Sequence, residues 1–417
     1  MKVNLFQQAP YRFMPAGFED RGIPSVVKPP YGELVEPERM FDSYRWFMDE
    51  LLAGLRAGFD GVAVTEHGQT SYDMTPNPNL PAAVLANAIR TDHPETALIV
   101  LGRSLGKTRE PLRIAEEYAM LDVMSGGRLI AGLPVGLSYD ANLNNGIATV
   151  ETRDRYREAV ELMMRSWAED EPFTWNGKFS QYALVNSWPR PLQRPRPPVW
   201  VPGSGSPGTM QWTIEQGYAF VYLSWFGPTL TARRIFDRFW GLVDQSGIER
   251  NPYRVGFVQN VVVAETDARA EVEYGRYVEN AFRQGVGSVP GHYLGLPGYV
   301  EPRGIETLLR DPGDLGLAAE LSHATFGRLA DARSVIAGSP ATVREQIVDF
   351  ANEFRIGNLL VMLQMGGMPH DLTMKNIHLF AEQVLPHLRT LWDNEQGNDD
   401  VWENTWWPTG LRQEEAA

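Results

Sequence analysis

The sequence predicts an α/β protein that folds as a single (β/α)8 TIM barrel, with an insertion after the seventh strand and a C-terminal tail. Eight short apolar runs are spread over the 417 residues, and a segment with helical spacing follows most of them. The runs are continuously apolar, which is typical of parallel strands buried on both faces. In a barrel of eight such units, the functional site is expected at the carboxyl ends of the strands.

The first half of the chain supplies four strands with helices between them. Apolar residues at three- and four-residue intervals predict a helix over Phe41–Ala57, which Gly58 ends. Further helices are expected over Pro81–Arg90 and Pro111–Met124, and the clearest amphipathic helix covers Val150–Ala168. The four strands are expected at Val3–Phe6, Gly61–Thr65, Ala97–Leu101 and Arg128–Leu133.

The second half supplies the other four strands within the same domain, residues 1–391. Ser339 and Pro340 are typical of a helix start, and Thr373–Leu391 is expected to be the last helix. The Gly- and Pro-rich residues 285–336 are interpreted as an insertion that could serve as a lid, and residues 392–417, with four Trp, as a surface arm. The strands are expected at Val199–Val201, Ala219–Leu223, Val255–Ala264 and Asn358–Leu363, and the first three are followed by helices at Thr209–Tyr218, Leu230–Val243 and Asp267–Gln284.

The composition excludes several classes of protein. A net charge of −14 and a pI near 5.1 argue against nucleic acid or an anionic membrane as a main partner. The chain has no cysteine, which excludes disulfides, thiolate metal sites and cysteine nucleophiles. It shows no signal sequence and no run of about 20 apolar residues, so a soluble cytoplasmic protein is expected. The histidines lack metal-site spacing, and no G-x-S-x-G nucleophile motif occurs.

A glycine-rich turn, Gly203–Gly208, joins the fifth strand to its helix and is predicted to hold a phosphate. Free N–H groups and the positive end of the helix dipole attract anions at such a turn. The turn fits the G-x-G-x-x-G dinucleotide pattern, but no Asp or Glu lies between Gln216 and Phe236, where that motif requires an acidic residue. The sequence therefore argues against a classical Rossmann NAD site, and a plain Gly/Ser turn remains the alternative to a phosphate site.

Four segments of the chain resemble the bacterial luciferase-like flavin monooxygenases. They are Thr65-Glu66-His67, the run from Arg113-Ile114-Ala115-Glu116-Glu117 through Leu121-Asp122 to Ser125-Gly126-Gly127-Arg128, the glycine turn with Trp212, Gly217 and Leu223-Ser224-Trp225, and Gly338-Ser339-Pro340-Ala341-Thr342-Val343. The second is the most specific. The resemblance runs from about Val3 to Leu388 and leaves the insertion and the tail uncovered. Glu66-His67 followed by Pro76-Asn77-Pro78 is similar to the diketocamphane-type Baeyer–Villiger members.

The resemblance implies a two-component FMN-dependent monooxygenase. A separate NAD(P)H:flavin reductase supplies reduced FMN to such proteins, and molecular oxygen is the co-substrate. They oxygenate a small organic substrate through a C4a-peroxyflavin, and we expect an apolar ketone, alkane or aldehyde here. The resemblance also implies a homodimer. Two alternatives stay open: a deazaflavin (F420)-dependent oxidoreductase of the same fold, and a non-catalytic flavin-binding protein.

The resemblance also implies which residues hold the flavin. Arg153 matches a phosphate-binding arginine of the family, and its guanidinium suits a phosphate dianion. Luciferase has Glu at the position of Gly205 and Arg at the position of Val135, so this chain departs from the family at two phosphate contacts. Arg103 could balance part of the phosphate charge instead. The expected cofactor-binding residues are Gly102, Arg103, Ser104, Arg153, Ser204, Gly205, Ser206 and Thr209.

His67 matches the family histidine near the reacting edge of the flavin. A histidine at the end of a barrel strand can hydrogen-bond or protonate an oxygen near neutral pH, and we therefore expect it to be catalytic. Arg128 opens the fourth strand and is interpreted as structural, paired with a carboxylate of the Asp122 type. The residues expected to wall an apolar substrate pocket are Tyr72, Trp225 and Phe226.

Overall fold

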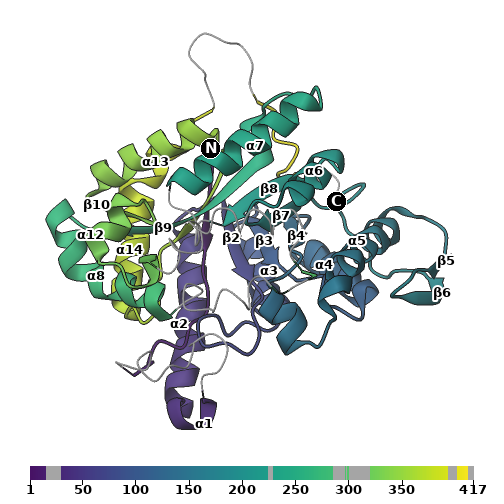
Figure 1. The fold of residues 1–417 in the computed structure, drawn as a ribbon, viewed down its shortest axis with the longest axis horizontal. Helices are drawn as coiled ribbons and strands as arrows, with labels where there is room; N and C mark the ends of the chain where they lie inside the picture. The colour runs from purple at the N-terminus through teal and green to yellow at the C-terminus, as the bar shows by residue number, and fades with distance from the viewer. Residues whose placement is uncertain are drawn as a thin grey trace.

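Eight parallel strands form a closed barrel (Figure 1). The computed structural model describes residues 1–15, 30–223, 229–284, 296, 298–299, 320–392 and 402–411, with the backbone alone at 229 and 230. Closure follows from the pairing of β11 with β1 and of β9 with β8. The barrel strands are β1 (Lys2–Phe6), β2 (Gly61–Thr65), β3 (Ala97–Gly102), β4 (Leu129–Gly132), β7 (Val199–Gly203), β8 (Ala219–Leu223), β9 (Val255–Val263) and β11 (Asn358–Met362). The predicted TIM barrel is confirmed, with all eight strands where the apolar runs placed them.

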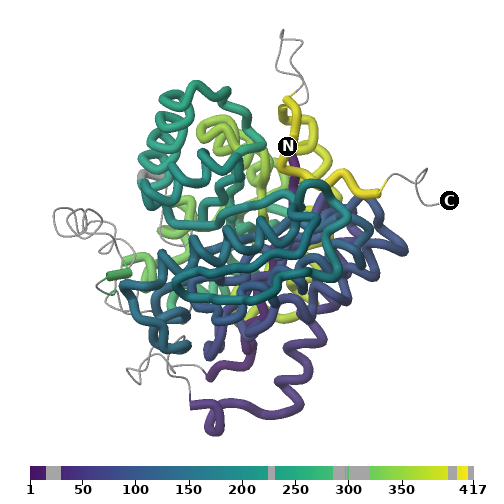
Figure 2. The backbone as a smooth tube through the Cα atoms, turned by 90° about the vertical axis from the view of Figure 1, so that its right-hand side faces the viewer, coloured from purple at the N-terminus to yellow at the C-terminus, as the bar shows by residue number. Residues whose placement is uncertain are grey.

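Helices surround the barrel, which is why its strands are apolar on both faces (Figures 1 and 2). Ser339 caps one helix start as expected, because its side chain accepts a hydrogen bond from the Thr342 N–H. On the outer face of β9, the Phe257 ring lies 5.8 Å from Phe236 of α7 and 4.2 Å from Phe350 of α13. The helices are α1 (Tyr31–Leu34), α2 (Pro37–Arg56), α3 (Asn79–Asp92), α4 (Pro111–Met124), α5 (Thr152–Ala168), α6 (Pro207–Glu215), α7 (Thr229–Gln245), α8 (Asp267–Gln284), α12 (Phe326–Asp331), α13 (Pro340–Phe354), α14 (His370–Gln383) and α15 (Leu385–Leu388).

Three strands were not predicted from the sequence. An antiparallel hairpin of β5 (Phe173–Asn176) and β6 (Gln181–Val185) lies in the polar stretch after α5. Strand β10 (Val335–Gly338) pairs in parallel with the last four residues of β9, beyond the part of β9 that pairs with β8. It lies at the end of the region interpreted as an insertion, and it exists because β9 is longer than the other barrel strands.

Residues 402–411 pack against the barrel, so this part of the tail is not the surface arm that we expected. The Trp406 side chain is buried, and its indole N–H donates to the Gly217 carbonyl at 3.0 Å. Its own carbonyl accepts from the Trp200 indole at 3.1 Å, and the Pro408 carbonyl accepts from Arg128 at 3.3 Å. Trp200 and Arg128 lie where β7 and β4 begin, so the tail covers the amino-terminal end of the barrel.

Arg128 has a structural environment, but its acidic partner is not Asp122. Its guanidinium forms an ion pair with Glu95 at 3.2 Å. Asp122 instead accepts hydrogen bonds from the Gln193 side chain at 2.7 Å and from the Gln193 N–H at 3.1 Å. The expected pairing is wrong because Gln193, in the long segment before β7, reaches the Asp122 carboxylate. No helix among the described residues has both the length and the apolar character needed to cross a bilayer.

Candidate active site

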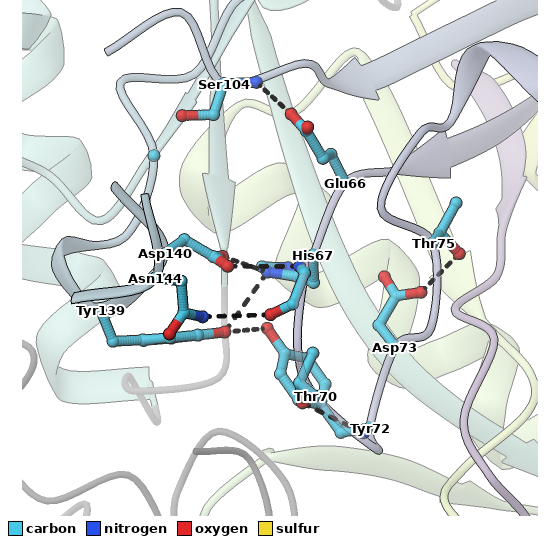
Figure 3. Close-up of polar contacts among 12 residues, drawn as sticks. Glu66, His67, Thr70, Tyr72, Asp73, Thr75, Ser104, Tyr139, Asp140 and Asn144 are labelled. Carbon is cyan, nitrogen blue, oxygen red and sulfur yellow. Dashed lines mark hydrogen bonds and ion pairs between the residues drawn. The ribbon is translucent and has the colours of Figure 1, made fainter. Parts of the chain in front are cut away.

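His67 lies just past the end of β2, where the side chain of Asp140 holds its ring (Figure 3). The distance from His67 Nδ1 to Asp140 Oδ2 is 2.9 Å, and the other oxygen of Asp140 accepts from the Gly68 N–H at 3.3 Å. Burial alone would raise the pKa of Asp140, but the hydrogen bond and charge of His67 lower it overall. An ionised carboxylate can only accept, so Nδ1 carries the proton and Nε2 is the nitrogen left for another partner.

Two tyrosine hydroxyls extend this pair. The Tyr72 and Tyr139 oxygens are 2.7 Å apart, and the Tyr139 oxygen lies 3.4 Å from His67 Nδ1. The Tyr72 ring centre is 4.9 Å from the His67 ring centre (Figure 3). Burial raises the pKa of both tyrosines well above its usual value, so both stay neutral. The predicted residue Tyr72 is thus next to His67, and its buried ring shields one side of the imidazole from water.

A second buried carboxyl, Asp73, lies beside this group. Its Oδ1 accepts from the Ala9 N–H at 3.1 Å and from the Thr75 hydroxyl at 2.7 Å. Its Oδ2 is buried and has no hydrogen-bond partner within the described part of the chain. Burial raises the pKa of Asp73 to about 6, although the charge of His67 opposes the shift. Two carboxyl groups near one imidazole therefore differ in their protonation at mildly acidic pH, between about 4 and 6.

The residues that follow β3 make hydrogen bonds to the residues that follow β2 and β4. A Cβ on Gly102 would lie 2.4 Å from Thr65 Oγ1, so a larger residue where β3 meets β2 would force the Thr65 side chain to move. The Ser104 N–H donates to Glu66 at 2.7 Å, and its hydroxyl donates to the Val135 carbonyl at 2.9 Å (Figure 3 shows the Glu66 contact).

Arg103 is engaged away from the glycine turn. Its guanidinium donates to Asn77 Oδ1 at 2.8 Å and lies 3.6 Å from Glu117 of α4. Neither partner belongs to the turn before α6 or to α5. The charge of Arg103 is therefore balanced by Glu117, and the structure does not bring Arg103 together with Arg153 and Thr209.

The glycine turn presents open donors to the mouth of the barrel. Ser206 is the N-terminal cap residue of α6, and its side chain makes no capping hydrogen bond. Among the described residues we find no partner for the N–H groups of Gly205, Ser206 and Gly208. Gly205 has φ +98°, and a Cβ there would lie 2.8 Å from the Ile235 side chain. Any residue other than glycine would therefore be strained at this position. Ser204 is exposed.

Arg153 reaches this turn from α5. Its Nη1 lies 3.4 Å from the Thr209 hydroxyl, and its Nε donates to the Tyr299 carbonyl at 3.2 Å. The Tyr299 ring centre is 5.9 Å from the guanidinium, and its hydroxyl donates to the Gly136 carbonyl. Because the Thr209 oxygen accepts from Arg153, its own hydrogen is available to a ligand. The structure thus brings together Arg153, Ser206 and Thr209, three residues that were predicted from separate parts of the sequence.

The sequence itself matches a known family model, described as luciferase-like monooxygenase, over residues 39–354. This range is more than half of the chain. The protein belongs to the luciferase-like monooxygenase family. The resemblance stated from the sequence is confirmed, and with it the assignment of this protein as an enzyme of that family. The residues that the structure describes contain no cluster of three or more side chains suited to a metal ion.

Relatives of this luciferase-like monooxygenase differ in chemistry. The oxygenase component of a flavin-dependent trigonelline monooxygenase from Acinetobacter baylyi is 30% identical over 165 residues, 39% of this chain and 43% of that protein. The match thus spans less than half of that relative. The oxygenating constituent of 3,6-diketocamphane monooxygenase from Pseudomonas putida, solved with FMN, superposes with TM-score 0.64 at 20% identity, covering 93% of this chain and 98% of that one. An F420-dependent secondary alcohol dehydrogenase gives TM-score 0.63 at 14% identity, covering 93% and 99%. The two structures show a shared fold.

Some site residues of this luciferase-like protein carry no signal in the sequence. Asp140 and Tyr139 lie in a π-helical turn, Tyr139–Asn144, between β4 and α5, where no motif marks them. Tyr299 lies within the region interpreted as an insertion, and most of that region is outside the described residues. Only their position in the sequence could have indicated a role in the site, because a segment that follows a barrel strand lies at the carboxyl-terminal mouth of the barrel. The predicted substrate residues Trp225 and Phe226 also lie outside the described residues.

Proposed function

We propose that this protein is the oxygenase component of a two-component system. In this proposal it binds reduced FMN, supplied by an NAD(P)H:flavin reductase, and uses molecular oxygen to oxygenate a small organic substrate. The observation that carries the proposal is the convergence of Arg153 on the first turn of α6, at the same mouth as the Asp140–His67 pair. The name of the Acinetobacter relative, an oxygenase component, supports the need for a separate reductase.

The donors at the glycine turn fit a phosphate monoester. The N–H groups of Gly205, Ser206 and Gly208, the hydroxyls of Ser206 and Thr209 and the Arg153 guanidinium would share a dianion between them. A site with one cation and several neutral donors matches the charge of a single terminal phosphate. Arg153 would fix the phosphate, and the glycines would let it approach the backbone closely.

The Asp140–His67 pair would act at the reacting centre. Reduced FMN, when bound, supplies the electrons that activate oxygen. His67 would present Nε2 to the oxygenated substrate or to the cofactor, to accept or return a proton there. Asp140 holds the imidazole in one tautomer and one orientation. The buried Tyr72 and Tyr139 rings would exclude water from one side of His67.

The phosphate contact can be tested by comparing FMN with riboflavin, which lacks the phosphate. We expect Arg153→Gln to weaken binding of reduced FMN about tenfold or more and to leave riboflavin binding unchanged, because a charge-assisted hydrogen bond is lost only with FMN. Arg157→Gln is the matched control, because Arg157 lies one turn later on α5 and stacks on Trp212 at 4.9 Å. Equal losses for FMN and riboflavin would contradict the phosphate site.

The same titrations separate the alternatives. Tight binding of F420 and hydride transfer without oxygen uptake would favour the deazaflavin enzyme. Binding of FMN with no oxygenated product from ketones, alkanes, aldehydes or carboxylates would favour a flavin-binding protein without catalysis. Oxygen consumption that yields labelled product from 18O2 would support the proposed oxygenase.

We also propose that the protein forms a homodimer through helices α3 and α4. Large apolar side chains are exposed on both helices, which pack against each other. Such a surface is typical of an interface between chains. Light scattering should give the mass of two chains, and Val84→Glu with Met120→Glu should halve it. A single-chain mass for the parent protein would refute the dimer. The exposed side chains are Leu80, Val84, Met120, Val123 and Met124.

A further inference from the structure

A cavity of about 400 Å³ opens at the carboxyl ends of the strands, beside the His67 site. The loops after β1 and β2, the second half of α8 and the segment after β11 form its walls. Pockets of roughly 300–1,000 Å³ are the size that holds small organic ligands. None of the residues assigned above to the phosphate site lines it. Neither the family match nor the relatives assign a ligand to this cavity.

The cavity is positively charged in an acidic protein. Three of its lining residues are arginines, Arg12, Arg276 and Arg283, and no Asp or Glu is among the described residues that line it. The charge of Arg12 is already balanced, because both of its terminal nitrogens donate to the buried carboxylate of Glu50, at 2.6 and 2.8 Å. Arg276 has no such carboxylate among the described residues, although the whole chain has a net charge of −14.

Arg276 is the cation best placed to receive an anion. Within the described part of the chain it has no ion pair, and its guanidinium contacts the hydroxyl and the ring of Tyr277, 4.5 Å from the ring centre. Arg283 lies two turns later on α8 and donates to Asn280 Oδ1 at 3.2 Å, which orients its guanidinium. The two planar cations can bind one carboxylate through paired N–H donors.

The remaining walls suit an organic body rather than a free inorganic ion. Tyrosine and methionine side chains supply apolar surface, while amides supply neutral donors and acceptors for polar substituents. A second hollow of about 420 Å³, between α5 and the β5–β6 turn, lacks this character, since Asp154 and Glu158 oppose its cations. The walls of the cavity beside His67 include Tyr11, Tyr72, Met362, Met365, Gln8 and Gln364.

Tyr72 connects the cavity to the reacting centre. It lines the cavity, and its ring also contacts His67, with 4.9 Å between ring centres. A ligand anchored by Arg276 and Arg283 would therefore have its far end next to Tyr72 and close to His67. The distance between anchor and reacting group would then decide which carbon of the ligand is oxygenated.

We propose that this cavity is the substrate site and that it selects a small organic carboxylate with an apolar or aromatic body. The proposal rests on the proposed oxygenase function for the word substrate, but binding of the carboxylate does not depend on flavin. It refines the expectation of an apolar ketone, alkane or aldehyde, because such molecules offer no anion to the guanidinium of Arg276, which has no ion pair within the described residues.

The test is calorimetric binding to the flavin-free protein of benzoate, phenylacetate and hexanoate, each compared with its uncharged amide. At least one carboxylate should bind about tenfold or more tightly than its amide. Arg276→Gln with Arg283→Gln should reduce that preference to less than about threefold. Arg269→Gln is the matched control and should keep the preference, because Arg269 lies on the same helix, pairs with Glu265 and Glu273, and does not line the cavity.

Two outcomes would overturn the proposal. One is the absence of a preference for every carboxylate over its amide, and the other is an unchanged preference in the Arg276/Arg283 double variant. Reduced FMN is titrated into the same variants, and circular dichroism confirms that they are folded. A parent protein that binds reduced FMN but shows no preference for any carboxylate over its amide would reject the cavity as a carboxylate site and leave the oxygenase function standing. A parent protein that prefers a carboxylate over its amide but does not bind reduced FMN would reject the oxygenase function and leave the carboxylate site standing.

Discussion

Replacement of Asp73 by Asn should remove a large part of the pH dependence of stability. The carboxyl is buried beside His67, and burial raises its pKa from 3.8 to about 6. The folded protein therefore holds the Asp73 proton more tightly than the unfolded chain does. Between pH 4 and pH 6 the folded state binds more protons, so stability falls as the pH rises through this window. The shift is about two pKa units, each worth roughly 1.4 kcal/mol, so the loss is about 3 kcal/mol.

The variant keeps the two hydrogen bonds that Asp73 Oδ1 accepts, from the Ala9 N–H and the Thr75 hydroxyl, because an Asn oxygen can accept both. Its NH2 group would take the place of Oδ2, which has no partner among the described residues, and this costs about 1–3 kcal/mol at every pH. The constant cost cancels when the two proteins are compared across pH. Only the pH-dependent difference reports the pKa of Asp73.

The assay is urea unfolding of the parent and of Asp73→Asn at pH values from 4 to 8. Relative to the parent, the variant should gain about 3 kcal/mol of stability between pH 4 and pH 7. Asp154→Asn controls for the loss of a carboxyl at an exposed site. A difference between parent and variant that stays constant over this range would refute the reasoning, because it would mean that folding does not raise the pKa of Asp73.

Three other predictions concern the His67 pair, the glycine turn and the tail. Asp140→Asn should lower the oxygenation rate by about 100-fold while leaving the Kd for reduced FMN unchanged, since Arg153 is untouched; a parallel loss of FMN binding would contradict a role limited to His67. Gly205→Ala should lower the free energy of unfolding in urea by about 1–3 kcal/mol, because φ is +98° and a Cβ would contact Ile235. Adding Ile235→Ala to this variant should relieve the clash with Ile235 but not the backbone strain. Trp406→Ala should cost about 3 kcal/mol, whereas the exposed Trp188→Ala should cost little; equal effects would show that the tail does not stabilise the barrel.

Much of the fold is predictable from local sequence because burial on two faces leaves a local signature. Each barrel strand is continuously apolar, and each coincides with an expected run. The cap at Ser339 is equally local, because its partner is three residues away. Strand β10 and the β5–β6 hairpin were missed for the opposite reason. Their apolar runs are too short for periodicity to distinguish a strand from a helix. Strand β10 forms only because β9 extends past the neighbouring barrel strands.

The candidate site divides in the same way. The glycine-turn motif and the resemblance to the family single out His67, Arg153, Ser206 and Thr209, and closure of the barrel places Arg153 beside Thr209. Asp140 could not be found from the sequence, since its partner is 73 positions earlier and its π-helical turn has no motif. The same is true of the contact between Arg153 and Tyr299.

By itself, the sequence determined the barrel and the family and predicted the phosphate role of the glycine turn, because periodicity, caps and glycine geometry act over a few residues. Only the tertiary structure decided which side chains meet at the mouth, how Trp406 covers the other end of the barrel, and where Arg276 and Arg283 line a common cavity. Those contacts join residues that lie far apart along the chain, and their geometry exists only once all eight strands have closed into a ring.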